Sequence, residues 1–212
     1  MTTFVWMARV SYAFLDALLT PSLKAAQEAN GSGEFWATSP RQLTSLTDSE
    51  TEFIATRDSF YMATITENGW PYVQHRGGPP GFLRVLDGQT LAFADFRGNR
   101  QYISIGNLGA NNRAALILMD YPRRRRLKLL GHIEVKHLGS EAKLAQRVAV
   151  KGYKAKVERI MLIHLKAFDW NCPRHLTPRF TEQELNSVLA PIRARLIALE
   201  NENNALRARL GL

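Results

Sequence analysis

The feature that most constrains this chain is a series of short β-strand patterns separated by two-residue turns. Asn68-Gly69 and Asp87-Gly88 each lie between two such patterns. Asn-Gly and Asp-Gly are typical of type I′ turns, whose backbone twist matches that of paired antiparallel strands. The sequence therefore predicts two successive β-hairpins that form an antiparallel meander. The four strand patterns cover residues 59–66, 71–76, 82–86 and 90–96.

Three further strand patterns follow, at 114–121, 126–137 and 157–170, with helical patterns near 99–107 and 140–149. Six or seven strands close together in one chain favour closure into a barrel, because closure removes exposed sheet edges. We therefore expect a mainly β (α+β) fold, a six- or seven-stranded antiparallel barrel with flanking helices.

Helical signals flank the predicted barrel on both sides. Pro21 suits the first turn of a short helix, and Thr47 with Glu50 three residues later is a capping-box pattern that opens another. We expect an N-terminal helical extension over 1–47, a barrel domain over 48–178 and a C-terminal helical dimerisation segment over 179–212.

The C-terminal segment carries a heptad pattern of apolar residues. Leucine or isoleucine recurs at alternating spacings of four and three, with Asn203 at one a position. Because proline interrupts a helix interior, we expect the zipper to begin at Pro191. The d positions are Ile192, Leu199 and Leu206, and the a positions are Leu196, Asn203 and Leu210.

Polar residues beside this seam favour pairing of two chains. An Asn at position a favours two parallel strands, because its side chain bonds its symmetry mate. The g-to-e′ pairs are Arg195 with Glu200 and Glu202 with Arg207, both opposite in charge. We expect a homodimer, and the alternative is an amphipathic helix that packs on its own domain.

The formal charge of +9 indicates a partner that carries negative charge. Nucleic acid, an acidic surface and a phosphorylated small molecule all fit, as does a basic surface that is merely solvated. The arginine run at 123–126 has neither interleaved aromatic residues nor a continuous basic helix, so nucleic acid is the weakest hypothesis. No apolar run approaches the roughly 18 residues of a membrane span. With Cys172 as the single cysteine, we expect a cytoplasmic protein that has no membrane partner.

Common catalytic motifs are absent from the sequence. It contains no G-x-S-x-G, Walker loop, G-x-G-x-x-G before a helix, or H-E-x-x-H. The five histidines lack metal-ligand spacing, so we expect no metal site and assign no catalytic acid, base or nucleophile.

Two segments instead indicate a phosphate site. Arg76 ends a strand beside Gly77, Gly78 and Gly81, which free the backbone to approach a ligand closely. The segment 98–101, which contains Arg100, lies just before a short predicted helix. A helix N-terminus with an adjacent arginine is suited to binding phosphate. Together the segments predict a phosphorylated ligand between strand and helix.

The segments QHRGGPPGF, GNRQYISIGNLGANNRAALILMD and WNCP resemble the pyridoxamine 5′-phosphate oxidase-like family of FMN-binding split barrels. The resemblance covers roughly residues 48–172. It implies a split barrel that binds FMN at the interface of a homodimer, and a flavin-dependent oxidoreductase acting on an unidentified small molecule. The alternative is a protein of the same fold that binds flavin or haem without catalysis.

The resemblance also implies roles for individual residues. Arg76, Arg100 and Gln101 would hold the FMN phosphate, and Asn99, directly before Arg100 in the matching motif, would also bind the cofactor. Gln74, His75 and Gly77 would line the flavin ring, while Arg126 and Lys128 would reach it from the neighbouring strand. The partner subunit would contribute the region of Trp170, Asn171 and Arg174.

Two departures from the family pattern affect these expectations. Gln101 stands where the family usually has lysine, which removes one charge from the phosphate site. Residues 171–175 differ from the R-L-H-D-R signature that binds pyridoxal phosphate, so we do not expect vitamin B6 oxidation.

Overall fold

The computed structural model describes residues 12–34, 45–170 and 172–211. Its contacts divide the chain into two compact units. The larger ends at Arg174, and the smaller comprises Tyr121–Arg124 and His175–Leu212. No helix in the described ranges is long and apolar enough to cross a membrane.

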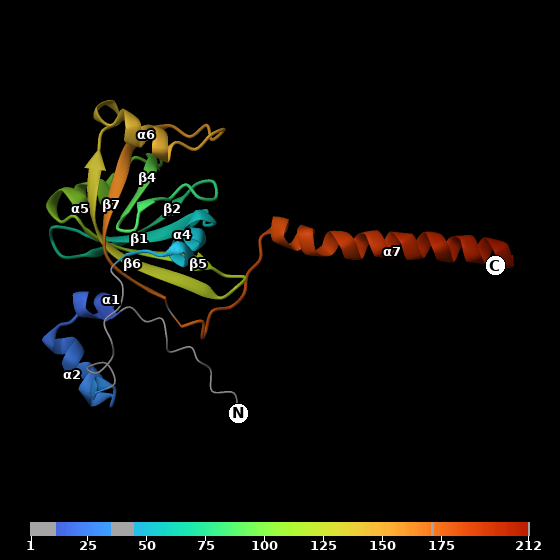
Figure 1. Cartoon of the computed structure of the whole chain (residues 1–212), viewed down its shortest axis with the longest axis horizontal. Coiled ribbons are helices and arrows are strands. Elements are labelled where there is room, and N and C mark those ends of the chain that lie inside the picture. The colour runs from blue at the N-terminus through green and yellow to red at the C-terminus, as the bar shows by residue number, and fades with distance from the viewer. Residues whose placement is uncertain (1–11, 35–44, 171, 212) are drawn as a thin grey trace. The chain divides into compact units, whose positions relative to one another are not determined.

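The larger unit is built on one seven-stranded antiparallel sheet, which confirms the predicted fold class (Figure 1). Its strand order is β2-β1-β5-β6-β7-β4-β3. Both predicted hairpins form, but the expected meander was wrong, because β2 and β3 lie at opposite edges of the sheet. The strands are β1 (Ser59–Ile65), β2 (Pro71–Gly77), β3 (Arg84–Asp87), β4 (Thr90–Phe96), β5 (Arg113–Asp120), β6 (Arg125–Lys136) and β7 (Val157–Trp170).

The sheet curls around an apolar core. Phe60 of β1 contacts Phe93 of β4 with ring centroids 5.3 Å apart, although these strands are not neighbours in the sheet. The long strands β6 and β7 bend where their register shifts at Leu130/Gly131. A Cβ at Gly131 would lie 2.8 Å from the His164 carbonyl oxygen, so only glycine permits this approach.

Short helices cover the ends and faces of the sheet. α4 (Asp48–Ala55) begins with the predicted capping box, in which the Thr47 N–H donates to Glu50 Oε2 at 2.9 Å. α6 (Ala142–Val148) packs on β4 and β7 through Val148, and Figure 1 shows it at the end of these strands. The other helices of this unit are α1 (Tyr12–Ala17), α2 (Pro21–Ala29) and α5 (Ile103–Ala110), with a 3₁₀ turn at Leu138–Ser140.

The smaller unit contains one long helix, α7 (Glu182–Leu210), which carries Pro191 in its interior. The expectation that the helix is interrupted at Pro191 was wrong. Thr181 caps the helix well before Pro191, and its N–H donates to Glu184 Oε2 at 2.8 Å. A proline in a helix interior removes one backbone hydrogen bond and bends the helix. Here the helix nevertheless continues on both sides of Pro191.

A buried hydrogen bond joins α4 to the end of β7. Trp170 Nε1 donates to Glu50 Oε1 at 2.6 Å, and the Trp170 ring meets Phe53 edge-on at 4.8 Å. Hydrogen bonds from Thr47 and Trp170 hold the pKa of Glu50 below its ordinary value, although burial alone raises it. The Glu50 carboxylate is therefore retained in its charged form by its donors.

Trp170→Phe is expected to destabilise the fold by about 2 kcal/mol or more, because it removes one donor from a buried carboxylate and leaves a cavity. Urea denaturation measures the loss. Trp70→Phe is the matched control, since Trp70 is 72% exposed and its change should cost less than about 0.5 kcal/mol. Equal losses in the two variants would contradict the structural role of the Glu50 hydrogen bond.

Candidate functional site

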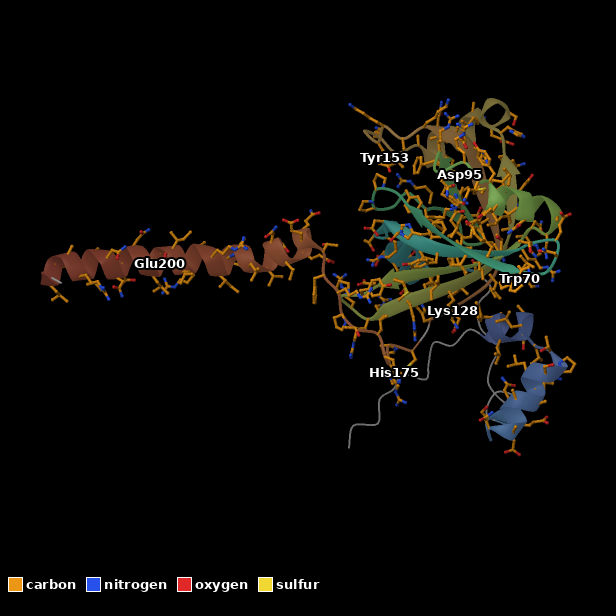
Figure 2. The ribbon with its side chains drawn as sticks, turned by 180° about the vertical axis from the view of Figure 1, so that it is seen from behind. Trp70, Asp95, Lys128, Tyr153, His175 and Glu200 are labelled. Atoms are coloured by element: carbon orange, nitrogen blue, oxygen red, sulfur yellow. The ribbon has the colours of Figure 1, made fainter. Side chains whose placement is uncertain are left out.

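A cleft of about 290 Å³ opens between β2, β4 and the turn that precedes α5. Its polar lining comes mainly from the end of β2 and the turn after β4, while Phe82, Phe93 and Phe96 form an apolar wall. Tyr153, from the segment before β7, completes one side, and Figure 2 shows it at the same end of the barrel as Asp95.

Alternating charges run along this cleft. Arg76 Nη1 lies 2.6 Å from Asp95 Oδ1, and Arg159 Nε lies 3.7 Å from Asp95 Oδ2. Arg159 Nη2 also contacts Glu158 at 2.7 Å, and Glu158 accepts from Arg97 Nε at 2.7 Å. Three arginines thus alternate with two carboxylates from the cleft interior to its rim.

Burial sets the electrostatics at the inner end of this chain of charges. It lowers the pKa of Arg76 and raises the pKa of Asp95, because removal from water disfavours both charged forms. At the rim, the hydrogen bond from Arg97 lowers the pKa of Glu158. Asp95 compensates the charge of Arg76, so Arg76 is not an unpaired cation.

The turn between β4 and α5 has an unusual backbone. Arg100 (φ +66°) and Tyr102 (φ +52°) both adopt the left-handed conformation that non-glycine residues rarely occupy. Tyr102 is the N-cap of α5 and makes no side-chain cap hydrogen bond, so the first N–H groups of the helix lack a capping acceptor. Strain of this kind is concentrated at ligand-binding sites.

Contacts of Tyr102 hold the turn in place. Its hydroxyl donates to Glu158 Oε1 at 3.2 Å, and the Arg159 guanidinium lies over its ring at 5.0 Å. Asn99 Oδ1 accepts from the Gln101 N–H at 3.1 Å. Arg100, in contrast, is exposed and makes no hydrogen bond or ion pair with any residue of the described ranges. It is therefore the cation of the cleft that is available to an anion.

One pair of polar side chains lies on the cleft floor. Ser104 is buried in the first turn of α5 and donates its hydroxyl to Gln74 Oε1 at 2.9 Å. This bond joins β2 to α5 and fixes the orientation of the Gln74 amide. Since the oxygen of that amide accepts from Ser104, its nitrogen is left to donate.

The structure brings six of the predicted binding residues together in the cleft lining: Gln74, His75, Arg76, Gly77, Asn99 and Arg100. Gln101 lies in the same turn, where its Oε1 accepts from Asn99 Nδ2 at 3.1 Å. Its side chain stabilises the turn instead of lining the cleft.

The other predicted residues lie elsewhere in the same chain. Arg126 and Lys128 alternate with core residues of β6 and therefore lie on the outer face of the sheet, and Figure 2 shows Lys128 well away from Asp95. Lys128 pairs with Asp169 at 2.7 Å, and Arg126 Nη2 donates to the Cys172 carbonyl at 2.9 Å. Trp170 lies in the core, Arg174 is exposed outside the cleft, and Asn171 falls outside the described residues.

Two glycines serve packing rather than ligand approach, which corrects the sequence interpretation. A Cβ at Gly78 would lie 2.7 Å from Phe82 Cγ, and Gly81 (φ +75°) would place its Cβ 2.8 Å from the Ala55 carbonyl oxygen. The sequence interpretation also missed Asp95, Glu158, Tyr102 and Ser104. Of these, Asp95 gave a signal, since a charged residue inside an otherwise apolar strand is rarely buried without a partner.

Comparison with known proteins is consistent with this architecture. The family model for pyridoxamine 5′-phosphate oxidase matches residues 46–176. No curated protein matches the sequence.

Several solved structures are similar at low identity, with TM-scores below 0.5. A single-residue variant of HupZ from Group A Streptococcus is 15% identical over 59% of this chain and 98% of its own, with a TM-score of 0.46. A candidate pyridoxamine 5′-phosphate oxidase from Lactobacillus delbrueckii is 18% identical over 60% and 95%, with a TM-score of 0.47. An FMN-binding protein from Syntrophomonas wolfei is 12% identical over 59% and 88%, with a TM-score of 0.41. The match to the family model, and not these structures, carries the family assignment.

Asp95→Ala is expected to lower the free energy of unfolding by about 3–5 kcal/mol, because it leaves the Arg76 guanidinium buried without its counterion. Chemical denaturation measures this loss. Asp58→Ala removes an exposed carboxylate near the end of β2 and should cost less than about 1 kcal/mol. An Asp95 variant as stable as the control would show that the ion pair does not hold the cleft together.

Proposed function

This chain belongs to the pyridoxamine 5′-phosphate oxidase family, and on that premise we propose that it binds FMN in the cleft and uses it as a flavin-dependent oxidoreductase. The observation that carries the proposal is Arg100, which lines the cleft, has no side-chain partner among the described residues and lies two residues before the N-cap of α5. An arginine and a helix N-terminus together suit a phosphate group.

Charge balance in the cleft supports a phosphate ligand. Arg76, Arg97 and Arg159 exceed Asp95 and Glu158 by one positive charge, and Arg100 adds a second. A phosphate monoester carries a charge of about −1.5 to −2 at neutral pH. The cleft and its proposed ligand are therefore close to electrically matched.

The remaining walls suit a planar ring. Phe96 and Tyr153 pack edge-to-face with ring centroids 5.0 Å apart and give the cleft an apolar side. The Gln74 amide, oriented by Ser104, offers a donor on the opposite strand. An aromatic wall and positioned polar groups are the usual combination in cofactor sites.

The size of the cleft favours a second copy as part of the site. Its volume of about 290 Å³ is at the lower limit of ligand pockets, which span about 300–1,000 Å³. Tyr61, Ile65 and Val73 are exposed on the outer face of β1 and β2, a contiguous apolar surface of the kind that marks an interface. We propose that this face packs on a second copy, whose Arg126, Lys128 and Arg174 then approach the ligand.

Bound FMN would supply reversible two-electron chemistry, accepting hydride from a donor and passing it to a substrate. The chain's part is to hold the phosphate through Arg100, to orient the ring against Gln74 and to exclude water with the Phe96 and Tyr153 wall. The substrate is a small molecule. Vitamin B6 is not favoured, since residues 171–175 lack the family's pyridoxal phosphate signature.

Arg100→Ala is expected to weaken FMN binding about 10- to 100-fold, because one charge-assisted phosphate contact is lost. Quenching of flavin fluorescence during titration measures the affinity. Arg113→Ala removes an exposed arginine at the start of β5, outside the cleft, and should leave the affinity unchanged. Unchanged affinity in the Arg100 variant would refute the phosphate assignment.

If the protein is an oxidoreductase, bound FMN should be reduced when the holoprotein is mixed anaerobically with a reduced nicotinamide cofactor. It should be reoxidised when an electron acceptor is added. Flavin absorbance follows both steps, with free FMN as the control. A protein that binds FMN but changes its rate of reduction with none of the nicotinamide donors would be a flavin carrier instead of an oxidoreductase.

A further inference from the structure

The strongest feature that the flavin site does not use is the apolar seam of α7. The helix is 29 residues long, and none of its residues is buried. Its large apolar side chains remain exposed, and Figure 2 shows side chains projecting from it on every side around Glu200. The seam consists of Leu185, Leu189, Ile192, Leu196, Leu199, Leu206 and Leu210, with Asn203 among them.

We propose that α7 pairs with α7 of a second copy of this chain as a parallel, in-register two-stranded coiled coil over residues 185–210. The helix continues through Pro191, so Leu185 and Leu189 extend the heptad series by one d and one a position. The seam therefore has four d and four a positions, whereas the pattern after Pro191 alone has three of each.

The ring of Pro191 does not enter the seam. It falls at heptad position c, which faces away from the partner helix in a coiled coil. The helix has a capping box at Thr181 and Glu184, and at its other end Gly211 (φ +74°) donates its N–H to the Arg207 carbonyl. Both ends are therefore satisfied by the helix itself, and the seam is the part of the described helix that lacks a partner.

Asn203 determines the orientation. In a parallel pair, position a faces a′, so the two Asn203 amides meet and bond each other. In an antiparallel pair a faces d′, and every d residue here is leucine or isoleucine. Asn203 would then be buried without a hydrogen-bond partner, which is costly.

Charge complementarity gives the same register. In-register parallel pairing places Arg195 beside Glu200 of the second copy, and Glu202 beside its Arg207. Both pairs are opposite in sign and occur twice by symmetry. A second copy of this chain is therefore the binding partner that matches both the apolar seam and its flanking charges.

Site-specific disulfide cross-linking of the full-length chain tests the proposal. In a Cys172→Ser background, Ile192→Cys and Leu206→Cys each place one thiol at a d position. Parallel in-register pairing predicts that each variant, oxidised alone, forms a covalent dimer on a non-reducing gel. Ala205→Cys, at the outward c position of the same helix, is the matched control and should yield at most a trace.

An antiparallel pair can place at most one of these two positions across its symmetry axis, so a dimer from only one variant would overturn the proposal. A dimer from neither, with both proteins folded by circular dichroism, would show that α7 does not pair with α7 of a second copy. FMN titration of the same samples separates this from the flavin site. A protein that binds FMN but does not cross-link contradicts only the helix pairing. A protein that cross-links but does not bind FMN contradicts only the proposed function.

Discussion

The ion pair between Arg76 and Asp95 is the interaction on which the site depends. It joins β2, at one edge of the sheet, to β4, which lies next to the opposite edge. Backbone hydrogen bonds do not connect these strands, so side chains must hold the two margins of the sheet together. Since the side chains of Arg76 and Asp95 are only 13% and 7% exposed, the loss of either partner would leave a largely buried charge uncompensated.

The arginines of the cleft differ in whether a carboxylate pairs with them. Arg76 is occupied by Asp95, and Arg97 and Arg159 are occupied by Glu158 and Asp95. These pairs connect the strands around the cleft, and the turn with left-handed Arg100 and Tyr102 places Arg100 just before the start of α5. In the proposed function, structural and ligand-binding roles are therefore carried by different members of one cluster. The resemblance implies that Arg76, Arg100 and Gln101 hold the phosphate together.

Local patterns were sufficient to predict the strands, the two antiparallel hairpins and the capping box at Thr47, because turn and cap chemistry depends on neighbouring residues. They also placed Asn99 and Arg100 just before a helix, and both residues line the cleft. They were not sufficient to show that the two hairpins lie at opposite edges of the sheet instead of forming one meander. They could not reveal that β2 meets β4, since this contact depends on how the whole sheet curls, and so Asp95 was missed. At Pro191 a local rule was misleading. Proline predicts an interruption of the helix, but α7 continues through this residue.

The proposed function requires that the cleft recognises a flavin through its phosphate. The most direct measurement is the absorbance spectrum of the protein after it is mixed with one equivalent of FMN or of riboflavin and then desalted. The two ligands share the flavin ring and differ in the phosphate. If the phosphate is recognised, the flavin absorbance bands remain with FMN and are lost with riboflavin. Retention of both to the same extent, or of neither, would contradict it.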